Sequence, residues 1–141
     1  MAYSDEQLSK IYDRTSGYCH VCGKKLAWSN YSNPGRRAAW EVEHSNPRVV
    51  GGTNKLGNLY PACILCNRSK GTVQSRTARS WYGRSKAPLS HTKRKQAKLL
   101  NAVIGAGLGL LFGHVVGGKD GAVVGTVVGA GLGHSVDPDA L

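Results

Sequence analysis

The pattern of apolar and polar positions changes abruptly near Lys98. Up to that residue, apolar side chains are interspersed with polar and charged ones, whereas residues 99–136 are apolar and glycine-rich and carry only Lys119 and Asp120 as charges. A break this sharp indicates a boundary, and 141 residues accommodate one small domain with an appendage. We therefore divide the chain into a domain over 1–92, a basic linker over 93–98, an apolar segment over 99–136 and a tail over 137–141.

Periodicity within the first domain predicts short helices and strands. Residues 4–7 form a capping box, and the apolar residues that follow recur at helical spacing, which predicts a helix over about 4–15. Residues 38–44 alternate as a strand, with Trp40 and Val42 on one face and Glu41 and Glu43 on the other. We also expect a return strand over 56–60 and a basic helix from Asn67 to about Tyr82, with Gly71 as its weak point.

Four cysteines lie in two Cys-x-x-Cys pairs, Cys19 with Cys22 and Cys63 with Cys66. A domain with so few large aliphatic residues needs a staple, and paired knuckles of this kind predict a four-thiolate structural zinc site. Two disulfides are the alternative, but they require an oxidising compartment, and the first residues are polar and acidic and do not resemble a signal peptide. His20, within the first knuckle, is expected to face solvent.

The charge is strongly positive and unevenly spread. The net charge is +11, and between His44 and Gly118 the chain has 12 Lys or Arg and no Asp or Glu. Such a run favours binding of a polyanion, with nucleic acid first and an anionic membrane surface as the competitor, although a plain solvated basic surface is also compatible. Trp81 and Tyr82 interrupt the run, and we expect them to fill a small core, stacking on bases being the alternative.

The order and spacing of several residues around the cysteines resemble those of the HNH endonuclease family, in its zinc-containing branch. The motif covers about residues 15–75 and consists of Trp40-Glu-Val-Glu-His-Ser-Asn-Pro47, Gly51-Gly52, Asn58-Leu59 and Cys63-x-x-Cys66-Asn67-x-x-Lys70-Gly71. The resemblance implies a small zinc-stapled ββα-metal nuclease domain, hence an α+β fold.

The resemblance also implies roles for individual residues. His44 is the general base that activates water, and Asn58 orients the imidazole or holds the loop. Glu43 and Asn67 hold a divalent cation, Mg²⁺ before others. Two positions depart from the usual motif: Glu43 stands where Asp is usual, and Asn67 makes this a His-Asn-Asn variant, in which a neutral amide is the weaker ligand for a hard cation. The cations expected to contact nucleic acid are Arg68, Lys70, Arg76 and Arg79.

Structural explanations remain open for some of these residues. Asn58 can serve only to cap a turn, and Asn67 is a residue type favoured at helix N-caps. Glu41, on the same strand face as Glu43, can supplement the metal shell, but we favour a surface salt bridge.

The apolar segment contains a glycine at every fourth position from Gly105 to Gly133. This spacing places glycines along one helical face and resembles the glycine-zipper hairpins of bacterial membrane-associated proteins. It predicts an α-helical hairpin with helices over about 99–117 and 121–136 and a turn at Gly117-Gly-Lys-Asp120. The first helix is long enough to span a bilayer and the second is marginal. A soluble oligomerisation hairpin and a poorly ordered tail are the alternatives.

These observations predict a Zn²⁺-stapled, divalent-metal-dependent endonuclease that hydrolyses DNA, RNA not being excluded, with a hairpin that anchors or oligomerises it. The basic residues at 93–95 place the domain in the cytoplasm, at the inner membrane if the hairpin inserts. This pairing suits a bacterial toxin, with an unidentified immunity protein as a further candidate partner, or a phage-related effector. The rival functions are a catalytically weak zinc-dependent nucleic-acid-binding module and a membrane-active protein whose tail is the effector.

Overall fold

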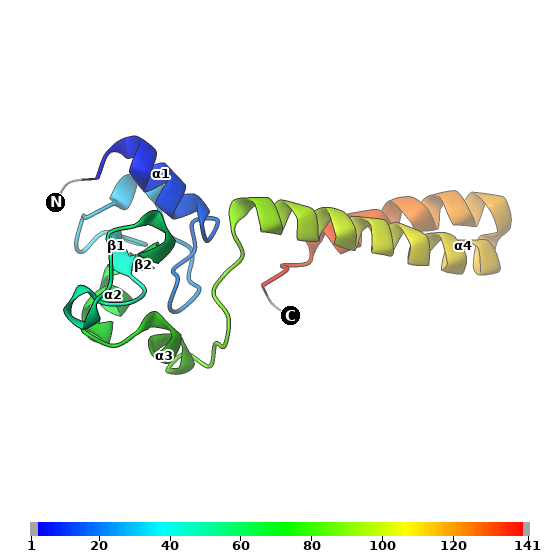
Figure 1. Ribbon diagram of the computed structural model, residues 1–141. Coiled ribbons are helices and arrows are strands. Elements are labelled where there is room, and N and C mark those ends of the chain that lie inside the picture. Colours follow the sequence, from blue (N-terminus) through cyan, green and yellow to red (C-terminus); the bar gives the residue numbers. More distant parts are fainter. Residues whose placement is uncertain (1–2, 140–141) are drawn as a thin grey trace. The chain divides into compact units, whose positions relative to one another are not determined.

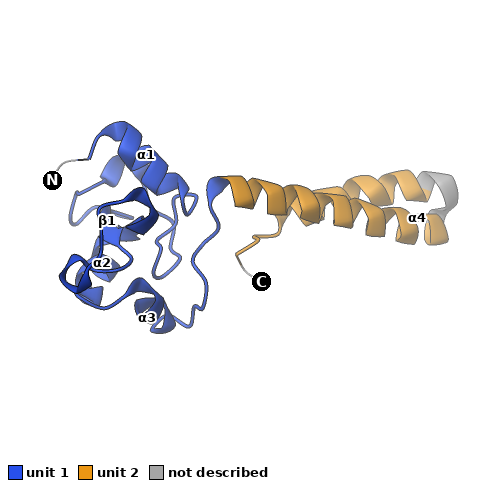
Figure 2. Cartoon of the chain, in the orientation of Figure 1, with its two compact units in different colours: residues 1–91 blue, residues 92–141 orange. Residues whose placement is uncertain are grey.

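The chain forms two compact units, Met1–His91 and Thr92–Leu141 (Figure 2). The structure is a computed structural model that describes residues 3–139, except residues 117–120. The first unit contains a two-stranded sheet and short helices, and the second contains a long helix pair (Figure 1). The predicted α+β class is confirmed.

The first helix of the chain is α1, Asp5–Asp13, and its capping box is fully formed. Ser4 Oγ accepts a hydrogen bond from the Gln7 amide, and the Gln7 side chain accepts one from the Ser4 amide. Leu8 and Ile11 are the buried residues of this helix. The capping residues therefore set where the helix begins, and its apolar spacing sets which face packs inward.

The sheet consists of β1, Trp40–His44, and β2, Leu59–Cys63, which pair antiparallel with Trp40 opposite Cys63 and His44 opposite Leu59. The return strand lies three residues later than predicted, because a 3₁₀ turn, η3 at Leu56–Asn58, occupies the expected start. Two other 3₁₀ turns are η1, Trp28–Asn30, and η2, Arg48–Val50. This register carries β2 directly into the second cysteine knuckle.

The single basic helix predicted from Asn67 to about Tyr82 is instead two helices, α2 over Ile64–Lys70 and α3 over Ser75–Ser80. The break falls at Gly71, whose φ of 54° and ψ of −120° lie in a region that side-chain-bearing residues rarely adopt. Gly71 therefore ends α2, and the chain turns before it resumes as α3. The β1–β2–α2 order is the ββα arrangement that the sequence predicts.

Aromatic rings around Trp40 form much of the small core. Trp40 is fully buried, and its ring lies 5.1 Å from that of Tyr12 and 4.8 Å from that of Tyr31, centroid to centroid. Trp81 and Tyr82, which we expected to fill the core, are instead 53% and 46% exposed. They follow the short α3, and the Tyr82 hydroxyl lies 3.4 Å from Cys66 Sγ.

The second unit is built on α4, His91–Ser135, whose two halves lie side by side (Figure 1). Because α4 begins at His91, the basic segment 93–98 is helical, unlike the linker we expected. The predicted turn, Gly117-Gly-Lys-Asp120, lies outside the described residues. Near the open end of the pair, Arg94 forms ion pairs with Asp137, at 2.7 Å, and with Asp139.

Glycines line the contact between the two halves of α4. A Cβ atom added at Gly105 would collide with the carbonyl of Gly129, and one at Gly109 would collide with that of Gly125. Gly107, in contrast, has nothing within 4 Å of such an atom. The glycines that recur every fourth residue therefore permit close backbone approach within the chain.

Candidate active site and metal centre

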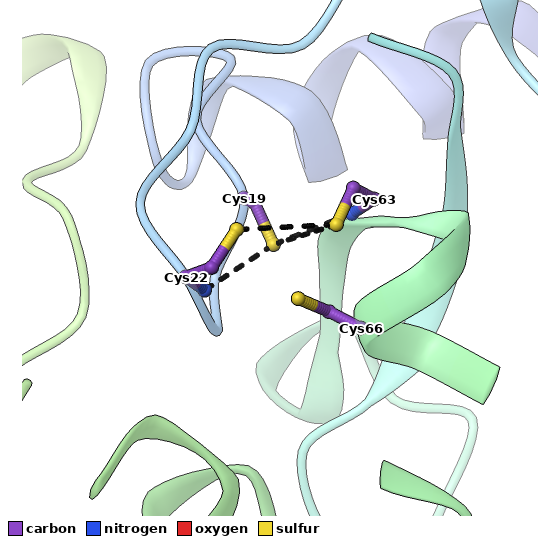
Figure 3. Close-up of side chains that lie close together, drawn as sticks. All are labelled: Cys19, Cys22, Cys63 and Cys66. Carbon is purple, nitrogen blue, oxygen red and sulfur yellow. Dashed lines mark hydrogen bonds between the residues drawn. The ribbon is translucent and has the colours of Figure 1, made fainter. Parts of the chain in front are cut away.

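The four cysteines of the two knuckles converge on one point (Figure 3). Their sulfur atoms all lie within 4.8 Å of one another, and all four are free of disulfides. Cys63 Sγ lies 3.8 Å from Cys19 Sγ and 3.9 Å from Cys22 Sγ. A tetrahedral zinc with Zn–S bonds of about 2.3 Å separates its sulfur ligands by about 3.8 Å. The spacing therefore fits a structural zinc ion and not a pair of disulfides.

The backbone around the knuckles supports the same interpretation. The amides of Cys22 and Cys63 donate to Cys19 Sγ, at 3.5 and 3.3 Å, which stabilises a thiolate there. Hydrogen bonds with Cys22 and then Cys63 raise the pKa of Cys19, whereas those with Cys19 and then Cys63 lower the pKa of Cys22, so the four thiols do not ionise alike. A bound dication removes that difference, because it ionises the thiols that it coordinates.

His44 is the last residue of β1 and lines an open hollow of about 220 Å³. Its Nε2 lies 2.8 Å from Asn54 Oδ1. An amide oxygen only accepts hydrogen bonds, so Nε2 of the neutral ring donates and Nδ1 keeps its lone pair. Asn67, from α2, and Arg48, from η2, line the same hollow. The structure thus brings the predicted base and one predicted metal ligand to a single surface depression.

Asn58, predicted either to orient the imidazole or to hold the loop, holds the loop. Its Oδ1 accepts from the Asn46 amide at 2.7 Å, and its Nδ2 donates to the carbonyls of Asn46 and Thr53, both at 2.9 Å. Gly52 belongs to the same loop, where a Cβ atom would collide with the Asn46 carbonyl. The residue beside the imidazole is Asn54, which we did not predict because nothing in its spacing separates it from an ordinary loop asparagine.

Glu43, predicted as a metal ligand, is fully buried, and both of its carboxylate oxygens have partners. Oε2 lies 3.2 Å from His20 Nδ1, while Oε1 accepts from Ser75 Oγ and lies 3.0 Å from Lys70 Nζ. Burial alone would raise the pKa of Glu43, but hydrogen bonds from His20 and Ser75 hold that pKa below its ordinary value. In this arrangement Glu43 is an ionised internal residue, not an open ligand.

His20 is also buried, contrary to the expectation that it faces solvent. Its ring stacks on Tyr60 with a centroid distance of 3.8 Å, and its Nε2 lies 2.7 Å from Arg79 Nη1. A guanidinium has only donors, so Nε2 accepts and Nδ1 carries the proton that faces Glu43. Desolvation lowers the pKa of His20, which agrees with this neutral form. Hydropathy patterning gave no sign of this contact, because it joins residues from separate elements.

The cations predicted to contact nucleic acid differ in their availability. Lys70 is almost fully buried, paired with Glu43 and donating to the His44 carbonyl at 3.0 Å, so it does not reach a phosphate here. Arg79 is half-buried against His20. Arg68 is exposed but bonded to Glu41 at 3.1 Å, and Arg76 is exposed. Arg48, which we had not singled out, is exposed beside the hollow.

Glu41 is the carboxylate that lies beside Asn67. Its Oε2 accepts from Asn67 Nδ2 at 3.0 Å, and its Oε1 accepts from Arg68. The Glu41 side chain is 21% exposed, whereas that of Glu43 has no exposed area. Carboxylate and amide oxygens are ligands that hard divalent cations prefer. The pair of Glu41 and Asn67 therefore fits such a cation better than Glu43 does in this arrangement, and the surface salt bridge we favoured for Glu41 is also present.

Comparison with known proteins identifies the class of this domain. Residues 19–72, which span both knuckles, β1, β2 and α2, match the model of the family described as HNH endonuclease. No curated protein matches the chain. The first unit therefore contains an HNH endonuclease domain, as its motif predicted, and that class comprises nucleases that depend on a divalent metal.

Proposed function

We propose that this chain is an endonuclease that uses His44 and a divalent cation to hydrolyse DNA phosphodiester bonds. The observation that carries the proposal is the shared hollow, in which His44 at the end of β1 meets Asn67 of α2. Its open shape admits a chain of nucleotides from solvent, and the HNH domain supplies the class of reaction.

In this proposal His44 performs the proton transfer. Nδ1 takes the proton from a water molecule as that water attacks phosphorus, while Nε2 remains bonded to Asn54 and keeps the ring in place. Asn67 and a glutamate of β1 would hold the cation, which stabilises the charge that develops on the phosphate and on the leaving oxygen. Arg48, exposed at the edge of the hollow, is positioned to contact a phosphate oxygen.

The charge distribution supports a nucleic-acid substrate. The run of 12 Lys or Arg without an acid, from His44 to Gly118, includes the exposed Arg48, which lines the hollow, and the exposed Arg76. Binding through phosphates alone is weakly dependent on sequence and strongly dependent on salt. We therefore expect cleavage with little sequence preference, with DNA as the first substrate and RNA as the competitor.

Plasmid cleavage tests the proposal directly. Full-length, zinc-loaded protein is incubated with supercoiled DNA in Mg²⁺, Mn²⁺ or EDTA, beside His44→Ala and the matched control His91→Ala, an exposed histidine outside the hollow. We expect metal-dependent nicking that His44→Ala abolishes and His91→Ala retains. DNA binding without cleavage by the folded wild type would instead favour the zinc-dependent binding module.

We further propose that the second unit associates with membranes. The 26-residue segment His91–Val116 is long and apolar enough to cross a bilayer, and none of its most apolar stretch is buried. Because the glycines are used inside the helix pair, the large side chains point outward; Leu111, Phe112, Val115, Val124 and Leu132 are all more than 60% exposed. Such a surface suits hydrocarbon, and the basic residues 93–98 suit the anionic face of the inner membrane.

Flotation of the full chain with liposomes tests this second proposal. We expect co-flotation that strengthens with anionic lipid, and a protein that stays in the dense fraction at all compositions would refute it. Self-association is the competing outcome, and light scattering without lipid detects it. If the chain is a delivered toxin, growth arrest on its expression requires His44, whereas arrest that His44→Ala retains would make the tail the effector.

A further inference from the structure

We propose that the two glutamates of β1 have separate tasks: Glu41, together with Asn67, holds the divalent cation, whereas Glu43 is a positioning residue that fixes the end of the strand beside His44. This inference rests on the proposed nuclease function of the hollow. It departs from the sequence motif, which places the cation at the acid immediately before the histidine.

Neither carboxylate oxygen of Glu43 can bind a cation unless it first loses its present partners. Its side chain has no exposed area, and its two oxygens face His20, Ser75 and Lys70. A cation at Glu43 would have to displace the Lys70 ammonium, which is only 3% exposed and would lose the carboxylate with which it is paired.

The partners of Glu43 come from three separate segments of the first unit. His20 lies between two zinc ligands, Ser75 opens α3, and Lys70 ends α2. Lys70 also donates to the backbone carbonyl of His44, so the carboxylate and the catalytic residue share one ammonium group. Glu43 therefore joins the first knuckle to the strand end and sets where the His44 backbone lies.

Glu41 meets the conditions that Glu43 does not. Its Oε2 is 3.0 Å from Asn67 Nδ2, and two neighbouring ligands of an octahedral Mg²⁺, each at about 2.1 Å, are separated by about 3.0 Å. Rotation of the Asn67 side-chain amide by about 180° places Oδ1 where Nδ2 now lies, so that an oxygen ligand stands beside Glu41. The other partner, Arg68, is 60% exposed and can exchange its contact for water.

Binding of Mn²⁺, measured by electron paramagnetic resonance on the full-length zinc-loaded protein, separates the two glutamates. Glu41→Gln and Glu43→Gln are a matched pair, because each removes one charge from the same strand. We expect Glu41→Gln to weaken Mn²⁺ binding by about tenfold or more and to keep the zinc content. Glu43→Gln should bind Mn²⁺ within about twofold of wild type, yet lower kcat for plasmid nicking while KM for DNA stays unchanged.

If Glu43→Gln alone does not fold, the double variant Lys70→Met/Glu43→Gln, which leaves neither charge buried, replaces it in the binding measurement. Weak Mn²⁺ binding by the Glu43 variant with normal binding by Glu41→Gln would overturn the inference, as would absence of Mn²⁺ binding by the wild type. If the wild type cleaves DNA while Mn²⁺ binding gives either of these two results, the proposed nuclease function is retained and only the assignment of the cation to Glu41 is rejected. An inactive wild type that still binds Mn²⁺ through Glu41 rejects the function and keeps the site.

Discussion

Replacement of Lys70 by methionine should destabilise the first unit severely. Lys70 Nζ lies 3.0 Å from the Glu43 carboxylate, and neither side chain has more than 3% of its area exposed. Methionine nearly matches lysine in volume but leaves Glu43 as a buried charge without its ammonium partner. Removal of one partner of a buried pair costs about 3–5 kcal/mol, a large share of the stability of a domain this size. A domain of this size loses about 4–8 °C in Tm per kcal/mol, so a cost of about 3 kcal/mol lowers Tm by at least about 12 °C.

The matched control is Arg68→Met, which breaks the other glutamate pair of β1. Arg68 is 60% exposed and lies 3.1 Å from Glu41, and exposed pairs of this kind contribute about 0–1 kcal/mol. Unfolding is followed by tryptophan fluorescence, since Trp28, Trp40 and Trp81 all lie in the first unit. The double variant Lys70→Met/Glu43→Gln should regain part of the lost stability, because both buried charges are then gone.

An unchanged unfolding midpoint for Lys70→Met would refute this reasoning. If that variant instead lost DNA affinity at full stability, Lys70 would be the phosphate contact that the sequence suggested, and its buried pairing would not persist in solution.

Four further outcomes follow from the same contacts. Purified protein should contain about one zinc per chain, and Cys66→Ser or a strong chelator should release it and unfold the first unit; a stable metal-free protein would contradict the staple. The pKa of Glu43 is lower in the folded than in the unfolded state, so ionised Glu43 stabilises the fold. This contribution is complete above the unfolded pKa, about 4.3, and is lost as pH falls through the lower folded pKa. The difference in free energy of unfolding between wild type and Glu43→Gln should therefore narrow only below about pH 4. A difference that does not change with pH would contradict this expectation. Gly109→Ala should disrupt the helix pair, seen as faster proteolysis of the second unit, while Gly107→Ala should leave it unchanged or stabilise it by about 1 kcal/mol. Asn54→Ala should lower kcat for plasmid nicking without loss of zinc or of DNA affinity, and unchanged turnover would exclude its role in holding His44.

The elements that local chemistry specifies were predictable from the sequence. The capping box fixes the start of α1, the alternation around Val42 marks β1, and paired cysteines at knuckle spacing indicate the zinc staple. The residue order from Trp40 to Gly71 identified the HNH domain, because the order and spacing of motif residues can be read directly from the sequence. Helix α2 ended where Gly71 marked a weak point, but the strength of that break was visible only in its φ and ψ values.

The corrections at the candidate site concern contacts between residues from separate elements of the first unit. A motif assigns Glu43 and Lys70 to chemistry by their positions, yet burial depends on what packs over them, and α2, α3 and the first knuckle cover both residues. Asn54 and Asn58 are both loop asparagines in sequence, and only the folded loop decides which one reaches the imidazole. Trp81 is apolar enough for a core, but it is 53% exposed, and the rings that pack against the buried Trp40 are those of Tyr12 and Tyr31.

The sequence by itself thus determined the class of domain, the four cysteines whose cluster fits zinc, the break in composition near Lys98 and the glycine spacing of the tail. Only the tertiary structure decided which glutamate is buried, which asparagine holds His44 and which cations remain exposed. The physical reason is that propensity, capping and metal-ligand spacing act over a few residues. Desolvation and ion pairing depend instead on the whole surroundings of a group, which the chain assembles only when it folds.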